Sequence, residues 1–203
     1  PLAGQIDLQQ GVIRAVSARA FTDDPLRTIR AVRQAMQFGF TIDADTAAWM
    51  HQAISGLATV SVERLRDEMV KLLQTDSAAE AVELLRRMGI LSEVLPPIAA
   101  LVGIEQSPPH HLPVYNHTLA VLNWSIRLLT DPSFLDFLSP IQRDLQDYIQ
   151  EKVAGNLSRA ALIRWSALCH DIGKPDTISR DETGQIHFYE HAKVGAKITE
   201  ALM

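Results

Sequence analysis

The chain has 203 residues, of which 47% are hydrophobic and 21% charged, and its formal net charge is −5. This is the composition of a folded globular protein, long enough for one large domain or two small ones. It excludes a protein that binds nucleic acid through its overall charge. It leaves room for a local basic surface, because salt screens charges beyond about 8 Å. There is no apolar run of the ~18 residues that a membrane span needs and no signal-peptide pattern, so we expect no membrane partner.

Cys169 is the only cysteine, which excludes an internal disulfide and a zinc site built from cysteines alone. A single cysteine fits the reducing cytoplasm, and we expect a cytoplasmic location. The sequence starts at Pro1 rather than at a methionine, and its last residues, VGAKITEALM, stop within a helical pattern. We therefore expect the chain to be a section of a longer protein.

The first part of the sequence predicts short helices that end at glycines. In the segment DDPLRTIRAVRQAMQFGF we expect Asp24 at the N-cap, Pro25 in the first turn and Gly39 just past the end. Apolar residues at helical spacing support this helix: Leu26, Ile29, Val32 and Met36. Further helices are expected over about 45–55 (closed by Gly56), from about 61, and over about 77–88 (closed by Gly89).

Five prolines punctuate residues 92–113 and mark the expected joint between two domains. We place the first domain at residues 1–91 and the second at 92–203. Helices of the second domain are expected over about 113–129 and 139–153 and from about Ser158 and His191, with a hairpin turning at Gly184. The predicted fold class is all-α, a small helical bundle followed by a helical domain with one short hairpin.

The stretch RWSALCHDIGKPDT places His170 and Asp171 where an apolar helix is about to end at Gly173 and Pro175. Adjacent helical residues point about 100° apart, so the two side chains share a ligand only at a helix end. His117 lies on the apolar stripe of its helix, and His191 starts the last helix. A buried histidine more often has a hydrogen-bonding neighbour than a metal, and both interpretations stay open here. Imidazole and carboxylate together suit Zn, Mn, Fe or Mg.

Three arginines, Arg27, Arg30 and Arg33, follow Asp24 at steps of three and form one basic stripe. A simple interpretation is that Asp24 caps the helix and the arginines are solvated. Another is that the arginines contact phosphates. Asp24 and Arg27 are also neighbours on a helical surface. A carboxylate beside a guanidinium matches the exocyclic amine and ring nitrogen that cytosine and adenine share, and mismatches guanine and uracil.

The segments FTDDPLRTIRAVRQAMQFGF and SVERLRDEMVKLL resemble the neck of class II tRNA nucleotidyltransferases and bacterial poly(A) polymerases. The resemblance implies that Asp24 and Arg27 select ATP and CTP by pairing with the base, with Asp23 where the family usually has Glu. It implies that Arg64 and Glu68 match an Arg-x-x-x-Glu motif and brace the neck helices as an i,i+4 pair. It also implies Mg²⁺ for the parent enzyme, and tRNA or another RNA 3′ end as partner.

The segments HHLPVYNHTLAVL, ALCHDIGKP and FYEHAKVGAKI resemble the HD superfamily of metal-dependent phosphohydrolases, a region appended to many members of the nucleotidyltransferase family. His117, His170 and Asp171 match its first three ligands of a divalent metal whose identity the resemblance leaves open. His191 resembles an extra histidine of some members. No helical aspartate follows Asp171 to match the closing ligand, and a proline at 113 stands where relatives often have Asp.

No Gly-Gly loop followed by Arg-Asp is found, so we expect the catalytic head to be missing and this section alone not to add nucleotides. The leading hypothesis is the neck and HD section of an RNA nucleotidyltransferase. The alternatives are a stand-alone HD phosphohydrolase and a non-catalytic RNA-binding module. The choice among CCA, A, CC and poly(A) addition stays open, as does the oligomeric state.

Overall fold

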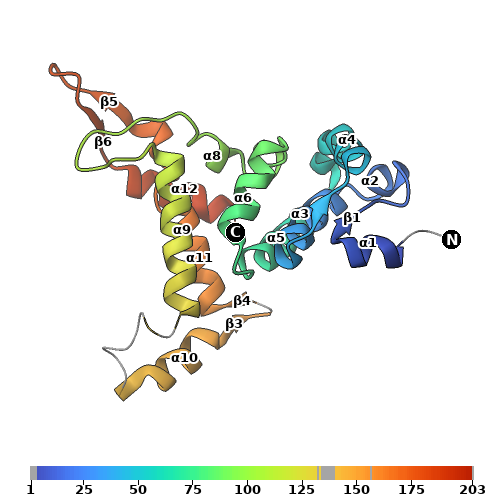
Figure 1. Cartoon of the computed structure of the whole chain (residues 1–203). Helices are drawn as coiled ribbons and strands as arrows, with labels where there is room; N and C mark the ends of the chain where they lie inside the picture. Colours follow the sequence, from blue (N-terminus) through green and yellow to red (C-terminus); the bar gives the residue numbers. More distant parts are fainter. Residues whose placement is uncertain (1–3, 132, 134–139, 156, 203) are drawn as a thin grey trace. The chain divides into compact units, whose positions relative to one another are not determined.

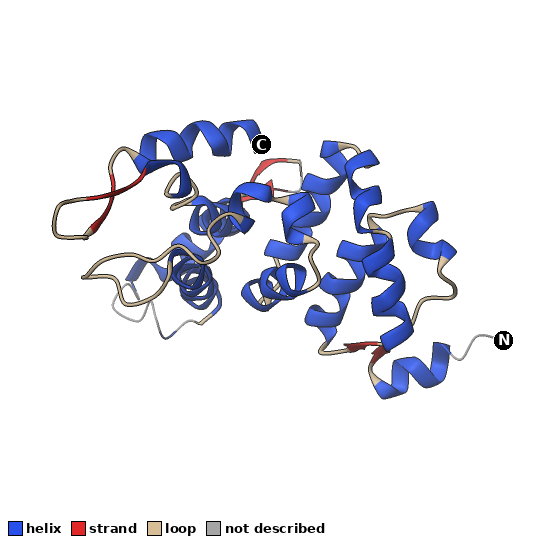
Figure 2. Ribbon diagram, turned by 90° about the horizontal axis from the view of Figure 1, so that it is seen from above, coloured by secondary structure: helices blue, strands red, loops and turns tan. Residues whose placement is uncertain are grey.

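The computed structural model describes residues 4–131, 133, 140–155 and 157–202. Helices dominate this part of the chain, and strands occur only as short pairs (Figure 1, Figure 2). The predicted all-α class is therefore confirmed. No helix in the described ranges is long and apolar enough to cross a membrane. The chain divides into two compact units, Pro1–Pro96 and Pro97–Met203, whereas the sequence analysis set the boundary between residues 91 and 92.

The first unit is built from short helices. In chain order its elements are α1 (Gly4–Gln10), β1 (Val12–Ile13), α2 (Arg19–Asp23), α3 (Arg27–Phe38), β2 (Thr41–Ile42), α4 (Ala44–Gln52), the 3₁₀ helix η1 (Ile54–Thr59), α5 (Val62–Leu73), α6 (Ala78–Arg87) and α7 (Leu91–Val94). The strands β1 and β2 pair in parallel, with Val12 opposite Thr41.

The helices α3, α5 and α6 pack on one another around an aliphatic core. The stripe expected for α3 faces this core, since Ile29 and Val32 are fully buried. The other two helices contribute the buried side chains of Met69, Leu72, Leu73, Val82 and Leu85. Full burial of one such side chain contributes about 1.5–3 kcal/mol. Tertiary packing therefore stabilises these helices, which at 10 or 12 residues are marginal in isolation.

Both ends of α3 bear on the sequence predictions. Gly39 ends the helix as expected, with a left-handed φ of 65° and its N–H directed at the carbonyls of Ala35 and Met36. The prediction for the start was wrong. α3 begins at Arg27, three residues after Asp24, and no side chain caps it; Asp24 contributes only its carbonyl oxygen, which accepts from the Arg27 N–H at 3.0 Å. Gly56 likewise does not close a helix but lies inside η1, where a Cβ would come within 2.7 Å of Pro25 Cγ.

The second unit contains the longest described helix. Its elements are α8 (Pro96–Ala99, which starts at the unit boundary), α9 (Val114–Thr130), α10 (Gln142–Gln150), β3 (Lys152–Ala154), β4 (Leu157–Ser158), α11 (Arg159–Cys169), the 3₁₀ helix η3 (Pro175–Thr177), β5 (Ile178–Arg180), β6 (Ile186–Phe188) and α12 (His191–Leu202). The hairpin of β5 and β6 turns at Gly184, whose φ is 82°. Residue 139, the expected start of one helix, lies outside the described residues.

The helices α9 and α11 lie side by side (Figure 1). After α11 the backbone turns and passes very close to α12. A Cβ on Gly173 would come within 2.2 Å of the His191 carbonyl oxygen and 2.5 Å of the Gly195 nitrogen. Only glycine fits at such a contact, because both obstructing atoms belong to the backbone. This contact brings the start of α12 beside the turn that carries His170 and Asp171.

Candidate functional site

The second unit brings His117, His170 and Asp171 together. The Ser158 side chain caps α11 by accepting a hydrogen bond from the Ala161 N–H, and α11 ends at Cys169. His170 is the C-cap residue, and Asp171 follows in the turn. His117 comes from the first turn of α9. One ligand atom of each of the three residues lies within 4.8 Å of the others.

One carboxylate oxygen of Asp171 is the centre of this cluster. Asp171 Oδ2 lies 3.1 Å from His170 Nε2 and 3.9 Å from His117 Nε2. The His170 ring is oriented from its other side, because Nδ1 lies 2.8 Å from the Ala167 carbonyl oxygen. The carboxylate is 6% exposed, and the two imidazoles are about one third exposed. The imidazoles therefore border solvent while the carboxylate stays covered.

Lys174, which the sequence analysis did not single out, is also part of the cluster. Its Nζ lies 2.8 Å from Asp171 Oδ2 and 2.7 Å from Gln106 Oε1, which accepts its hydrogen bond. The side chain is 4% exposed, which is rare for a lysine unless it is paired. Its position three residues after Asp171 in HDIGKP was the available signal, since residues i and i+3 face each other in a helical turn.

The charges of the cluster are strongly coupled. Burial disfavours the charged form of Asp171, but the close contacts with His170 and Lys174 outweigh it and hold the pKa of the carboxyl well below its usual range. Burial also opposes protonation of His170, yet the contacts with Asp171 and the Ala167 carbonyl raise its pKa. The pKa of His117 is lowered, first by burial and then by the neighbouring His170.

His191 lies on the other side of the carboxylate. Its Nε2 is 3.7 Å from Asp171 Oδ1, and its Nδ1 is 2.8 Å from the Phe188 carbonyl oxygen. The four predicted residues border one open cavity of about 390 Å³, together with His110, Lys174 and His187. His110 packs edge-on against the His117 ring, with ring centroids 5.4 Å apart. The cavity is thus lined by imidazoles and has a covered carboxylate at one side.

The donor set fits a divalent metal. Asp171 Oδ2 is buried, and among the described residues no donor meets it with hydrogen-bond geometry, although Lys174 Nζ lies nearby. Two imidazole nitrogens and this oxygen provide three ligands, the number that catalytic metal sites combine with water. An imidazole binds metal only in its neutral form. The ion would therefore displace the proton that the contact with Asp171 stabilises on His170. A Lewis acid that activates water is the chemistry such an ion supplies.

In the first unit, Asp24 and Arg27 lie close together. Arg27 Nε is 3.9 Å from Asp24 Oδ2, and its Nη1 donates to the Ala20 carbonyl at 3.0 Å. Arg64 Nη2 contacts both Asp24 oxygens, at 3.0 and 3.1 Å. Half of the Arg27 side chain is exposed, whereas Asp24 is mostly covered. Asp23 is exposed at the end of α2 and has no hydrogen-bond or ion-pair partner among the described residues.

Glu68 sits beneath the arginine stripe and is 2% exposed. It accepts hydrogen bonds from Arg33 Nε at 2.7 Å and from Arg30 Nε at 3.3 Å. The predicted i,i+4 pair of Arg64 and Glu68 is therefore not formed, and each residue instead contacts α3 or the turn before it. The reason is register, because α5 presents Arg64 to Asp24 and presents Glu68 to the middle of α3. Arg30 and Arg33 neutralise a buried carboxylate and are not simply solvated.

Comparison with known families agrees with both halves of this description. Residues 39–101 match the family described as "Probable RNA and SrmB-binding site of polymerase A". Residues 114–203 match the HD domain. Over 209 aligned residues, the chain is 32% identical to the A-adding tRNA nucleotidyltransferase of Deinococcus radiodurans. The chain is related to the tRNA nucleotidyltransferases. The resemblance inferred from the sequence is confirmed.

Other relatives of the family show how far the likeness extends. The CC-adding tRNA nucleotidyltransferase of Thermus thermophilus is 31% identical over 201 residues. The alignments with the Deinococcus and Thermus enzymes include 100% and 96% of this chain. They include only 42% and 40% of the relatives' own lengths. A crystal structure of a tRNA nucleotidyltransferase with primer tRNA and an ATP analogue shares the fold, with a TM-score of 0.57 at 22% identity, covering all of this chain and 48% of that one.

Proposed function

We propose that this chain is the neck and HD section of a cytoplasmic RNA nucleotidyltransferase, and that Asp24 and Arg27 read the base of the incoming ATP or CTP. The observation that carries the proposal is the Asp24–Arg27–Arg64 arrangement. Arg64 fixes the carboxylate without using all of its acceptor capacity, since a carboxylate has about four lone-pair sites. Arg27 is half exposed and able to donate to a base.

The proposed partners follow from the same arrangement and from the relatives. The acceptor of the nucleotide is a tRNA or another RNA 3′ end, and the parent enzyme uses Mg²⁺ for transfer to it. Arg30 and Arg33 each contact Glu68 through Nε, and their Nη1 atoms lie near Asp24 and Gln37, so they remain proposed phosphate contacts of secondary weight. Arg64 and Glu68 support the neck by holding Asp24 and α3 in place. Asp23 has no such contact to support this role.

The test is nucleotide incorporation by the full-length parent protein with Mg²⁺, tRNA lacking its 3′ end, and each of the four nucleotides supplied separately. Asp24→Ala and Arg27→Ala are expected to lose preference for ATP and CTP over UTP and GTP. Asp67→Ala and Arg19→Ala remove the same charges from exposed positions and serve as controls. If the first two variants keep wild-type preference while the protein adds nucleotides, base reading by this pair is wrong.

A second activity is favoured by the cluster in the second unit, namely metal-dependent phosphohydrolysis at the HD site. The metal ligands proposed are His117, His170 and Asp171, with His191 as a weaker candidate on the far carboxylate oxygen. The supporting observation is the buried carboxylate oxygen that faces two imidazoles at the edge of an open cavity. Asp171 would stay ionised as a ligand, and the bound ion would attract the anionic substrate.

Metal content and phosphate release test this second activity independently of nucleotide addition. The parent protein is equilibrated with Mn²⁺, dialysed and analysed for bound metal, then assayed for phosphate release from nucleotides. His170→Ala is expected to bind less metal than wild type, by the ion of the HD site, and to lose phosphate release. His51→Ala changes an exposed histidine of the first unit and is expected to match wild type in both. Equal metal content in His170→Ala and wild type would remove the metal assignment.

A further inference from the structure

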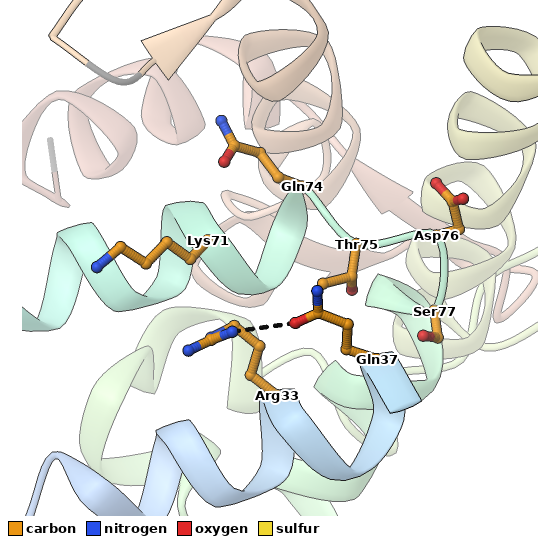
Figure 3. Close-up of a pocket in the computed structure, with 7 residues that line it drawn as sticks. All are labelled: Arg33, Gln37, Lys71, Gln74, Thr75, Asp76 and Ser77. Carbon is orange, nitrogen blue, oxygen red and sulfur yellow. Dashed lines mark hydrogen bonds between the residues drawn. The ribbon is translucent and has the colours of Figure 1, made fainter. Parts of the chain in front are cut away.

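A polar pocket opens on the first unit between α3 and the end of α5 (Figure 3). Its volume is about 400 Å³, and it is lined by Arg33, Gln37, Lys71, Gln74, Thr75, Asp76 and Ser77. None of these residues belongs to the Asp24–Arg27 pair. Arg33 and Gln37 reach the pocket from α3, while the remaining lining residues lie within the segment that matches the polymerase A RNA-binding family. The volume is sufficient for a nucleotide-sized fragment.

Positive charge is concentrated on one side of the pocket. Its two cations are Arg33 and Lys71, and the buried Glu68 beneath them contacts Arg33 Nε at 2.7 Å and Lys71 Nζ at 3.9 Å. Arg30, which also contacts Glu68, lies outside the pocket and 3.7 Å from Asp24. Asp76 is the one carboxylate in the lining, and it points away from Arg33 and Lys71 in Figure 3. The Arg33 and Lys71 side of the pocket is therefore locally positive, and a positive wall attracts anions.

The hydrogen-bonding groups at the α3 side of the pocket are donors. Arg33 Nε is occupied by Glu68, and Arg33 Nη1 donates to Gln37 Oε1 at 3.1 Å. Because the Gln37 oxygen is taken, the amide group of that side chain offers its NH₂. Within the described chain, Arg33 Nη2 has no hydrogen-bond partner, and Lys71 is half exposed with only its distant contact to Glu68. Guanidinium, ammonium and amide N–H groups together suit a ligand that only accepts, and a phosphate group is such a ligand.

The contacts that hold the donors also restrict their motion. Arg33 is 18% exposed and is fixed between Glu68 and Gln37, so its free Nη2 has a defined direction. The Ser77 hydroxyl donates to the Met36 carbonyl at 3.0 Å and ties the loop before α6 to the end of α3. A preorganised donor loses less conformational entropy on binding than a free surface side chain does. This distinguishes the pocket from a scatter of exposed lysines.

We infer that this pocket binds one phosphate group of the RNA substrate, with Lys71 and Arg33 as its charged contacts and the Gln37 amide as a further donor. The inference rests on the proposed function, because it assumes that the protein binds RNA. It adds a positioning site that is separate from base selection by Asp24 and Arg27. A phosphate of a bound nucleotide has the same chemistry, so the experiment contains one arm for each source.

The first arm measures the affinity of the full-length protein for labelled tRNA lacking its 3′ end, by fluorescence anisotropy at two salt concentrations. The variant is Lys71→Gln, which removes the half-exposed charge and, of the contacts of Glu68, only the longest one, at 3.9 Å, while the hydrogen bonds from Arg30 and Arg33 stay. The control is Arg87→Gln, an equal charge change at the far end of α6, about 15 Å along the helix and outside the screening length. Lys71→Gln is expected to weaken binding about three- to tenfold and to lower the salt slope by about one phosphate contact.

The second arm measures ATP binding by the same proteins with calorimetry. If Lys71→Gln weakens tRNA binding and leaves ATP binding unchanged, the phosphate belongs to RNA, as inferred. If it weakens ATP binding alone, the pocket binds phosphate but the assignment to RNA is overturned. If Lys71→Gln and Arg87→Gln match wild type in both arms, the pocket is rejected and the proposed function stands. If wild type binds neither ligand, both the pocket and the proposed function are rejected.

Discussion

Arg64 Nη2 contacts both oxygens of the Asp24 carboxylate, at 3.0 and 3.1 Å, and so joins α5 to the turn before α3. The contact explains why the Asp24 carboxylate has a defined orientation although it does not cap α3. In this arrangement the carboxylate is placed by one arginine and stands beside another, Arg27. A positioning role for Arg64 can be told apart from a purely structural one. Arg64 is half exposed, so its ion pair with Asp24 is expected to contribute at most about 1 kcal/mol to stability.

We therefore predict that Arg64→Met reduces nucleotide selectivity far more than it reduces stability. In the full-length protein the ratio of kcat/KM for ATP over UTP should fall about tenfold or more, because a released carboxylate no longer favours one base edge. The urea midpoint should barely move. Arg87→Met, at an exposed position on α6, is the control for loss of an arginine. An unchanged ratio together with a large drop in the urea midpoint would assign Arg64 to folding alone.

Glu68, in contrast to Arg64, is expected to affect stability strongly. It is buried and holds Arg30 and Arg33 by hydrogen bonds, so its removal leaves two cations near a covered site. Glu68→Gln should lower the free energy of unfolding by roughly 2–3 kcal/mol, since charge-assisted hydrogen bonds are lost within the helix packing. The exposed Glu80→Gln on α6 should change it by less than about 0.5 kcal/mol. Urea denaturation followed by circular dichroism measures both, and equal values would contradict the prediction.

The acid sensitivity of the first unit should depend on Asp43. This residue caps α4 by accepting from the Thr46 N–H, and it pairs with Arg14 at 2.6 Å. Burial opposes its ionisation, but the Thr46 hydrogen bond and the Arg14 charge outweigh burial and lower the pKa of Asp43. A lowered pKa means that the stabilisation is present above the unfolded value, near 3.9, and is lost as pH falls through the lower folded value.

The matched variant is Asp43→Asn, which keeps a capping side chain but does not titrate. We expect wild type to be more stable than the variant at pH 6, and the difference to shrink steadily between pH 4 and pH 2. Urea midpoints measured at each pH test this. A difference that stays constant over the range would show that the charge of Asp43 contributes nothing.

Much of the fold followed from local sequence signals. Gly39, Gly89 and Gly184 were expected at the ends of helices or in a turn, and each adopts a positive φ there. The all-α class followed from apolar residues repeated at helical spacing, as in α3. The start of α3 did not follow, because a capping aspartate and an aspartate bonded to a distant arginine look the same in sequence. Arg64 lies 40 residues from Asp24, and only packing sets that contact.

In the candidate site, too, local signals could be read from the sequence and long-range contacts could not. His117, His170 and Asp171 were grouped from spacing and from resemblance, and the structure brings them within 4.8 Å of one another. Gln106 was missed because its contact with Lys174 joins residues 68 positions apart and has no periodic signal, whereas the spacing of Lys174 from Asp171 was a signal that was passed over. The close passage of Gly173 against α12 was equally hidden, since a glycine in a turn usually indicates only a sharp bend. Long-range contacts that involve single polar atoms were therefore the part that the sequence did not reveal.

Lys174 leads to the last prediction, which concerns the covered carboxylate of Asp171. With Nζ at 2.8 Å, Lys174 neutralises this charge, and removal of one member of a buried ion pair typically costs about 3–5 kcal/mol. In the presence of a chelator, Lys174→Met should lower the free energy of unfolding by about 3 kcal/mol. Added Mn²⁺ should restore more stability to the variant than it adds to wild type, because a divalent ion supplies the missing positive charge.

The control is Lys193→Met, which changes a lysine of the same unit that is 69% exposed and should respond to Mn²⁺ as wild type does. Thermal denaturation of all three proteins, with chelator and with Mn²⁺, gives the comparison. An equal Mn²⁺ shift in Lys174→Met and wild type would mean that the ion does not act at Asp171. A larger shift in the variant, abolished by a further His170→Ala substitution, would locate the ion at the carboxylate that Lys174 otherwise neutralises, since His170 Nε2 is 3.1 Å from the same oxygen.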